Sequence, residues 1–185
     1  MEKLCDLIDL EEKLSAVSFA ANDINEILPL IHLNDSRKQE LYDLVMDNDN
    51  YLGYHAAWIL SHFSPQDNIW LYNKQDELID EVLVCEHGGR RRVMLNLLFK
   101  QPLSNPPRVD FLDFCLERML SAKELPGVQS LCMKIAYELC RTIPELTGEL
   151  KATLEIMEGD LTPAIHTVRK NVLKAMQKGK SLQKF

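Results

Sequence analysis

The sequence has 185 residues, of which 46% are hydrophobic and 26% charged, so one domain with a sizeable core fits it and a mostly disordered chain is excluded. A formal net charge of −7 disfavours a dedicated nucleic-acid-binding protein, which is normally basic. The charge is unevenly distributed, however. Residues 1–50 carry twelve acidic and four basic side chains, whereas residues 161–185 carry six basic and no acidic side chains.

The cysteines and the N-terminal sequence predict a reduced, cytoplasmic protein. The five cysteines are odd in number and contain no CxxC pair, which is typical of thiols packed as small hydrophobic groups. The N-terminal stretch MEKLCDLIDLEEKL is acidic and amphipathic and has no signal-peptide core. No run of 18 apolar residues occurs, so we expect no membrane partner.

Apolar residues recur at helical spacing along the whole chain. The helices expected from this spacing cover residues 2–20, 24–33, 37–47, 51–63, 74–85, 89–100, 108–122, 127–142, 145–158 and 163–178. Asp23, with Glu26 three residues later, predicts one N-cap, and Asp35 or Ser36 predicts the next. Pro107 is expected in a first helical turn behind a cap near Asn105. Thr162 followed by Pro163 gives a further start signal.

Four of the apolar helices can be aligned in one frame with a period near 40 residues. Equivalent positions are occupied by Leu60, Leu98, Leu139 and Met176, three residues earlier by Ala57, Leu95, Ala136 and Leu173, and one earlier again by Ala56, Met94, Ile135 and Val172. One further amphipathic helix lies between each consecutive pair. Such a helix pair cannot bury its apolar face alone, and the pattern therefore predicts stacked repeats.

The segments GYHAAWILSHF, RRRVMLNLLFK, SLCMKIAYELC and TVRKNVLKAMQ resemble the HEAT-like repeats of the armadillo/HEAT class of α-solenoids, of a small bacterial type. Val168 and Arg169 match the Val-Arg pair of that family, and Arg91 falls in the same frame, whereas Gly53 and Cys132 depart from it. The resemblance implies an all-α, right-handed α-α superhelix. We expect about four helix pairs in a single domain over residues 1–185.

Within this domain, residues 1–50 are expected to form acidic N-terminal capping helices and residues 51–178 the HEAT-like repeats. Residues 179–185 are expected to form a basic frayed tail. The resemblance implies a non-enzymatic protein-interaction or scaffold module. Its alternative is a nucleic-acid-binding or DNA-repair-like protein that uses a basic ridge.

Three consecutive arginines open the segment 90–100 and give two interpretations. Cations are unfavourable at a helix N-terminus, which favours an anionic ligand or acidic partner. The other interpretation is a solvated first turn paired with the acidic helix before it. If the repeats superpose, a basic ridge for a protein, phosphate or nucleic acid is expected. Its candidate residues are Arg90, Arg91, Arg92, Lys134, Arg169 and Lys170.

The remaining candidates are weaker. Tyr51, Trp70 and Tyr72 lie near expected helix ends and form a candidate exposed aromatic hot spot. Cys85 is a candidate reactive thiol if the nearby arginines lower its pKa, and a packed thiol otherwise. The histidines and cysteines do not supply the four ligands of a structural zinc site, and no nucleophile motif occurs. No cofactor, metal or catalytic residue is therefore expected.

Overall fold

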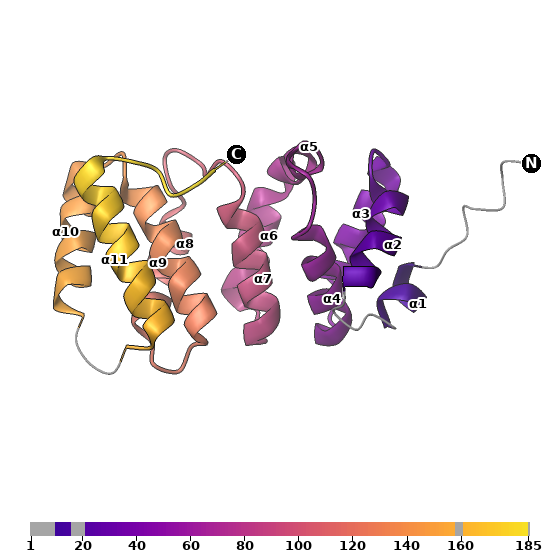
Figure 1. The fold of residues 1–185 in the computed structure, drawn as a ribbon, viewed down its shortest axis with the longest axis horizontal. Coiled ribbons are helices and arrows are strands. Elements are labelled where there is room, and N and C mark those ends of the chain that lie inside the picture. Colours follow the sequence, from indigo (N-terminus) through magenta and orange to yellow (C-terminus); the bar gives the residue numbers. More distant parts are fainter. Residues whose placement is uncertain (1–9, 16–20, 158–160, 185) are drawn as a thin grey trace, which may run out of the picture. The chain divides into compact units, whose positions relative to one another are not determined.

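The structure is a computed structural model that describes residues 10–15, 21–157 and 161–184. Within these ranges every regular element is helical (Figure 1), which confirms the all-α prediction. The chain divides into two compact units, residues 1–74 and 75–185. The single-domain organisation and the right-handed superhelix remain predictions.

The first unit is built around α4. Its helices are α1 (Leu10–Ser15), α2 (Ala21–Ile31), α3 (Asp35–Val45), α4 (Asn50–Leu60), α5 (Pro65–Asn68) and the 3₁₀ helix η1 (Ile69–Lys74). α4 contacts α1, α2 and α3. Ala56, Ala57 and Ile59 are fully buried there, because α4 carries apolar residues on more than one face. α5 and η1 were not predicted.

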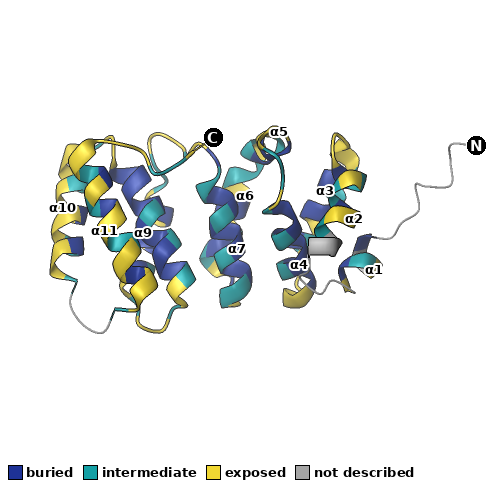
Figure 2. Cartoon of the chain, viewed as in Figure 1, coloured by how far each residue is buried: buried dark blue, intermediate teal, exposed yellow. Residues whose placement is uncertain are grey.

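The second unit consists of three helix pairs. They are α6 (Gln75–Val84) with α7 (Gly88–Phe99), α8 (Val109–Leu120) with α9 (Pro126–Cys140), and α10 (Pro144–Ile156) with α11 (Pro163–Lys178). α9 contacts α7, α8, α10 and α11. Figure 2 shows α9 as largely buried. This packing confirms the predicted alternation of long apolar helices with amphipathic partners.

Burial of the aligned positions supports the repeat frame. Ala56, Met94, Ile135 and Val172 are all fully buried, as a shared core position requires. Leu173 and Met176 in α11 are only half-buried, whereas their counterparts in α4, α7 and α9 are buried. α11 therefore has an outer face that its neighbouring helices leave accessible.

Helix ends were predicted less accurately than helices. Thr162 caps α11 and Pro163 occupies its first turn, as predicted. Asp23 lies inside α2 and so does not cap it, and α3 is capped by Asn34, whose side chain accepts from the Arg37 amide at 3.1 Å. α8 begins at Val109, so Pro107 precedes the helix.

The C-terminal tail is held against the second unit, which differs from the frayed tail predicted from its composition. The Tyr137 hydroxyl donates to the carbonyl of Lys180 at 2.8 Å. The buried carboxylate of Glu138 accepts from the backbone amide of Leu182. Gln183 donates to two carbonyls at the end of α7, at 2.8 and 2.7 Å. Local charge does not reveal such contacts.

α8 and α9 contain three buried cysteines, Cys115, Cys132 and Cys140. We predict that they do not react in the native protein. Burial raises the pKa of Cys115 well above the ordinary thiol value and that of Cys140 to about 11, and the thiolate is the reactive form. Iodoacetamide treatment followed by peptide mass spectrometry should label all three only after denaturation. Labelling of any of them in the folded protein would contradict this packing.

Candidate functional site

Arg91 closes the turn between α6 and α7. Its Nε donates to the carbonyl of Cys85 at 3.0 Å, and a second guanidinium nitrogen donates to the same oxygen. Its third nitrogen forms an ion pair with Glu124, and the two side chains are only 10% and 6% exposed. The carbonyl at the end of α6 has no helical partner, so this arginine satisfies it.

The other two pairs of the second unit are closed in the same way. Arg169, which is equivalent to Arg91 in the repeat frame, donates to the carbonyls of Leu154 and, at 2.9 Å, Glu155 near the end of α10. α9 has Cys132 at this frame position. There Gln129 donates to the carbonyl of Ser121, just after α8, at 2.6 Å. Arg91 and Arg169 are therefore engaged in structural contacts.

The expectation that the arginine triplet forms an exposed first turn is wrong for two of its members. Taken as whole residues, Arg90 is 3% exposed and Arg91 is 8% exposed. Arg90 forms an ion pair with Glu81 of the preceding acidic helix at 3.0 Å. Pairing with this helix was predicted for a solvated turn, whereas the Arg90 side chain is buried. Arg92 is half-buried, and its Cδ lies 2.6 Å from the position that a Cβ on Gly127 would occupy.

The six cations of the predicted ridge therefore differ in environment. Lys134 is half-buried, and its ammonium lies 5.5 Å from the centre of the Phe99 ring. Lys170 is exposed on α11. Because Arg90 and Arg91 are buried in ion pairs, the ridge as predicted does not offer all its charges to a ligand.

A basic row does occur on the outer face of α11. It consists of His166, Lys170, Lys174 and Lys178, spaced four residues apart and all exposed. These four side chains, with Arg169, Leu173 and Gln177, line a groove of about 650 Å³. We call this surface the α11 face. It includes Arg169 and Lys170 from the sequence prediction.

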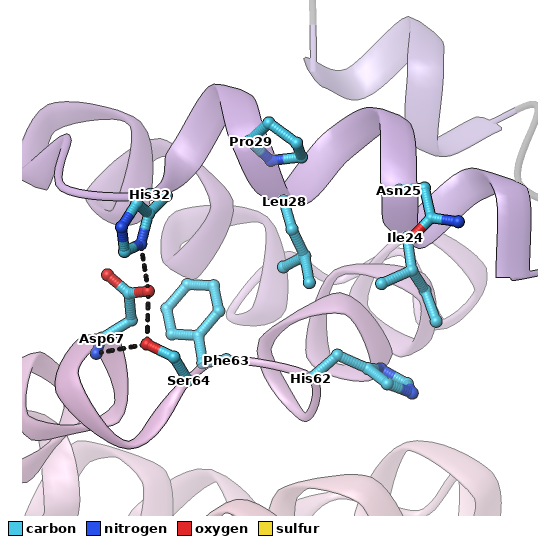
Figure 3. Close-up of a pocket in the computed structure, with 9 residues that line it drawn as sticks. All are labelled: Ile24, Asn25, Leu28, Pro29, His32, His62, Phe63, Ser64 and Asp67. Atoms are coloured by element: carbon cyan, nitrogen blue, oxygen red, sulfur yellow. Dashed lines mark hydrogen bonds and ion pairs between the residues drawn. The ribbon is translucent and has the colours of Figure 1, made fainter.

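A second concave site lies in the first unit, between α2 and the segment that leads from α4 into α5 (Figure 3). We call it the His32 groove. Its volume is about 470 Å³. The residues lining it are Ile24, Asn25, Leu28, Pro29 and His32 from α2 and its C-terminal end, and His62, Phe63, Ser64 and Asp67 from the second segment.

A buried carboxylate organises one end of this groove. Asp67 Oδ2 is 2.7 Å from His32 Nδ1 and accepts from the Ser64 hydroxyl at 2.8 Å, while Oδ1 pairs with the buried Lys38 ammonium at 3.0 Å. Burial alone would raise the pKa of Asp67, but hydrogen bonds from His32, Lys38 and Ser64 outweigh it and hold the pKa well below its ordinary value. The group is therefore a carboxylate at neutral pH.

Ser64, His32 and Asp67 resemble a catalytic triad in composition but not in geometry. In a triad the serine hydroxyl bonds to the histidine, which deprotonates it. Here the Ser64 hydroxyl donates to Asp67, and Ser64 also caps α5 by accepting from the Asp67 amide at 3.1 Å. No group of three metal-binding side chains occurs in the part of the chain that the structure describes. The arrangement is suited to binding rather than to acyl transfer.

The sequence did not indicate this site. Asp67 lies 35 residues away from His32 and joins it only through the fold. The available signal was Ser64 three residues before Asp67, which is typical of a helix start. It predicts a local cap but not the contact with His32.

The aromatic candidates and Cys85 are placed as follows. Tyr51 is 56% exposed in the first turn of α4, 4.0 Å from the His55 ring, whereas Trp70 and Tyr72 are half-buried in η1. Trp70 contacts Tyr42 edge-on with ring centres 6.0 Å apart. Burial raises the pKa of Cys85, so the nearby arginines do not activate it.

We predict that Arg91→Ala lowers the free energy of unfolding by about 3 kcal/mol, because it leaves the buried Glu124 and the Cys85 carbonyl without this donor. Arg92→Ala is the matched control and should cost under about 1 kcal/mol, since its side chain is half-buried. Urea unfolding followed by circular dichroism measures both. Equal losses would show that Arg91 has no special structural role.

We predict that Asp67→Asn destabilises the protein by about 3 kcal/mol near neutral pH. The folded-state pKa of Asp67 lies below its ordinary value of 3.8, so the carboxylate contributes stability above that value and loses it as the pH falls further. The stability difference between wild type and variant should therefore shrink below about pH 4. A difference independent of pH in urea unfolding would contradict this role.

Comparison with known proteins identifies the repeats. A family model described as a HEAT repeat domain matches residues 10–176. Neither a curated protein nor a solved structure matched the chain. No helix in the described ranges is both long and apolar enough to cross a membrane. The match covers both compact units and includes the helix pairs described above, and the chain therefore belongs to the HEAT repeat family.

Proposed function

We propose that this protein is an interaction module that binds an acidic helix of a partner protein along the α11 face. A HEAT repeat domain suggests a helical scaffold or protein-interaction module. The observation that carries the more specific proposal is the row of basic side chains on α11 beside an accessible groove.

The spacing of the row suits a helical ligand. Consecutive members are four residues apart, or about 6 Å along the helix axis. Glutamates four residues apart on a partner helix repeat at the same distance, and Leu173 supplies apolar surface between the cations. Residues 161–185 contain no acidic side chain, and Lys170, Lys174 and Lys178 form no ion pair within the described part of the protein. Their charges therefore remain available to a partner.

A nucleic acid is the weaker candidate. Arg90 and Arg91, two of the cations on which that alternative depended, are buried in ion pairs. Among the residues that the structure describes, no Phe, Tyr or Trp side chain lines the groove on α11, so stacking of unpaired bases has no platform there.

The test uses a fluorescein-labelled helical peptide with glutamate at every fourth position and leucine between. Fluorescence anisotropy should show saturable binding that weakens with salt. Lys170→Glu/Lys174→Glu should reduce the affinity about tenfold or more, because two attractive contacts become repulsive.

Three controls define the outcome. Lys123→Glu/Lys151→Glu makes the same charge change at exposed sites outside α11 and should leave binding nearly unchanged. The peptide with glutamine in place of glutamate should bind more weakly. Equal losses in the two double variants, or tighter binding of a labelled single-stranded oligonucleotide than of the acidic peptide, would refute the proposal.

A further inference from the structure

The His32 groove contains two histidines whose outward nitrogens have a defined chemistry. Asp67 is a carboxylate and can only accept hydrogen bonds, so the Nδ1 of His32, 2.7 Å away, carries the hydrogen. In the neutral ring Nε2 is then a hydrogen-bond acceptor. The His32 side chain is 52% exposed, and we therefore expect a ligand to be able to reach this nitrogen.

The position of the ring hydrogen of His62 is fixed in the same way. Its Nδ1 lies 2.9 Å from the carbonyl oxygen of Trp58, which also only accepts, so Nδ1 carries the hydrogen. The Trp58 ring contacts the His62 ring edge-on with centres 4.8 Å apart, which further restrains it. The neutral His62 ring therefore also presents an accepting Nε2.

The groove between these two acceptors is mainly apolar. Figure 3 shows His32 and His62 at opposite ends, with Leu28 and Phe63 between them. Ile24 and Pro29 extend the apolar lining. A volume of about 470 Å³ is in the range of small-molecule sites, which typically combine apolar walls with a few fixed polar groups.

Charge decides between ligand classes. Residues 1–74 carry thirteen acidic and five basic side chains, a net of −8, so the unit attracts cations and repels anions. Near the groove, the Asp67 carboxylate is paired with Lys38, which also bonds Asp35 at 3.3 Å. A carboxylate ligand would find two accepting nitrogens, the Asn25 amide as a donor, and a unit of net negative charge, whereas an ammonium group finds acceptors and a unit of opposite charge.

We propose that the His32 groove binds a small amphipathic amine, whose ammonium donates to a histidine Nε2 and whose apolar body lies on Leu28 and Phe63. This site lies in the first unit, and assigning it does not rest on the proposed partner binding at α11. The geometry assigns it a preference for donor over acceptor head groups. Ser64 and Asp67 position the His32 ring and do not contact the ligand's ammonium in this scheme.

The test compares three eight-carbon probes that differ only in the head group: octylamine, 1-octanol and octanoate. Isothermal titration of the full chain at about pH 8, above the ordinary pKa of histidine, should give saturable binding in the order amine, alcohol, carboxylate. Methyl signals of Ile24 and Leu28 should shift in NMR spectra on titration with amine. Octanoate binding most tightly, or shifts confined to other residues, would overturn the proposal.

His32→Phe keeps an aromatic ring but removes the accepting nitrogen, and should weaken octylamine binding about tenfold. Lys123→Phe, which places the same ring at an exposed site in the second unit, is the control and should leave the affinity unchanged. His32→Gln retains an acceptor and should recover part of the loss. If His32→Phe disturbs folding, the probe order and the methyl shifts in the wild type still decide.

The pH dependence gives a further readout. The titratable groups around the groove are His32, His62, Asp67 and, behind Asp67, Lys38 and Asp35. A protonated imidazole donates from Nε2 and carries charge, so the test is repeated at about pH 5, below the ordinary pKa of histidine, where Asp67 with its lowered pKa stays ionised. Octylamine affinity should fall and octanoate affinity should rise. An amine affinity that stays constant between the two pH values would contradict a histidine acceptor.

Discussion

A helix that ends inside a protein leaves carbonyl oxygens without helical partners. In each helix pair of the second unit, a side chain of the second helix donates a hydrogen bond to such a carbonyl at the end of the first. Arg91, Gln129 and Arg169 reach back to the ends of α6, α8 and α10. The turn between the helices is thereby fixed, and with it the face that each helix presents to its neighbour. We expect the packing of α9 against α7 and α11 to require these bonds. Arg91 adds an ion pair with Glu124, which ties the first pair to the loop before α9.

The helices and their repeat frame could be predicted because burial imposes a period on the sequence. Ala56, Met94 and Ile135 recur at one position, since each helix must bury the same face. Helix ends were less accessible to prediction. Polar residues such as Asp23 and Asn34 can serve either as caps or as positions inside a helix, and only the folded chain selects one. The docked tail was also missed, because its bonds use backbone groups far away in the sequence.

The same limit applies to function. Charge along the sequence showed that the C-terminal segment is basic, and α11 presents that charge outward. The arginine triplet is equally basic, yet Arg90 and Arg91 are buried in ion pairs with Glu81 and Glu124. A list of cations does not distinguish these cases, because the deciding partners lie on other elements. His32 shows the converse, since its partner Asp67 gives it a defined orientation that no local pattern predicts.

The central claim is that the accessible cations of α11, rather than the buried arginines of α7, form the binding face. Hydrogen–deuterium exchange of the full chain, with and without saturating acidic helical peptide, tests it most directly. Greater protection of residues 163–178 is predicted, with no change over residues 88–92. Protection of the first turns of α7, or unchanged exchange in α11 at saturation, would contradict the account.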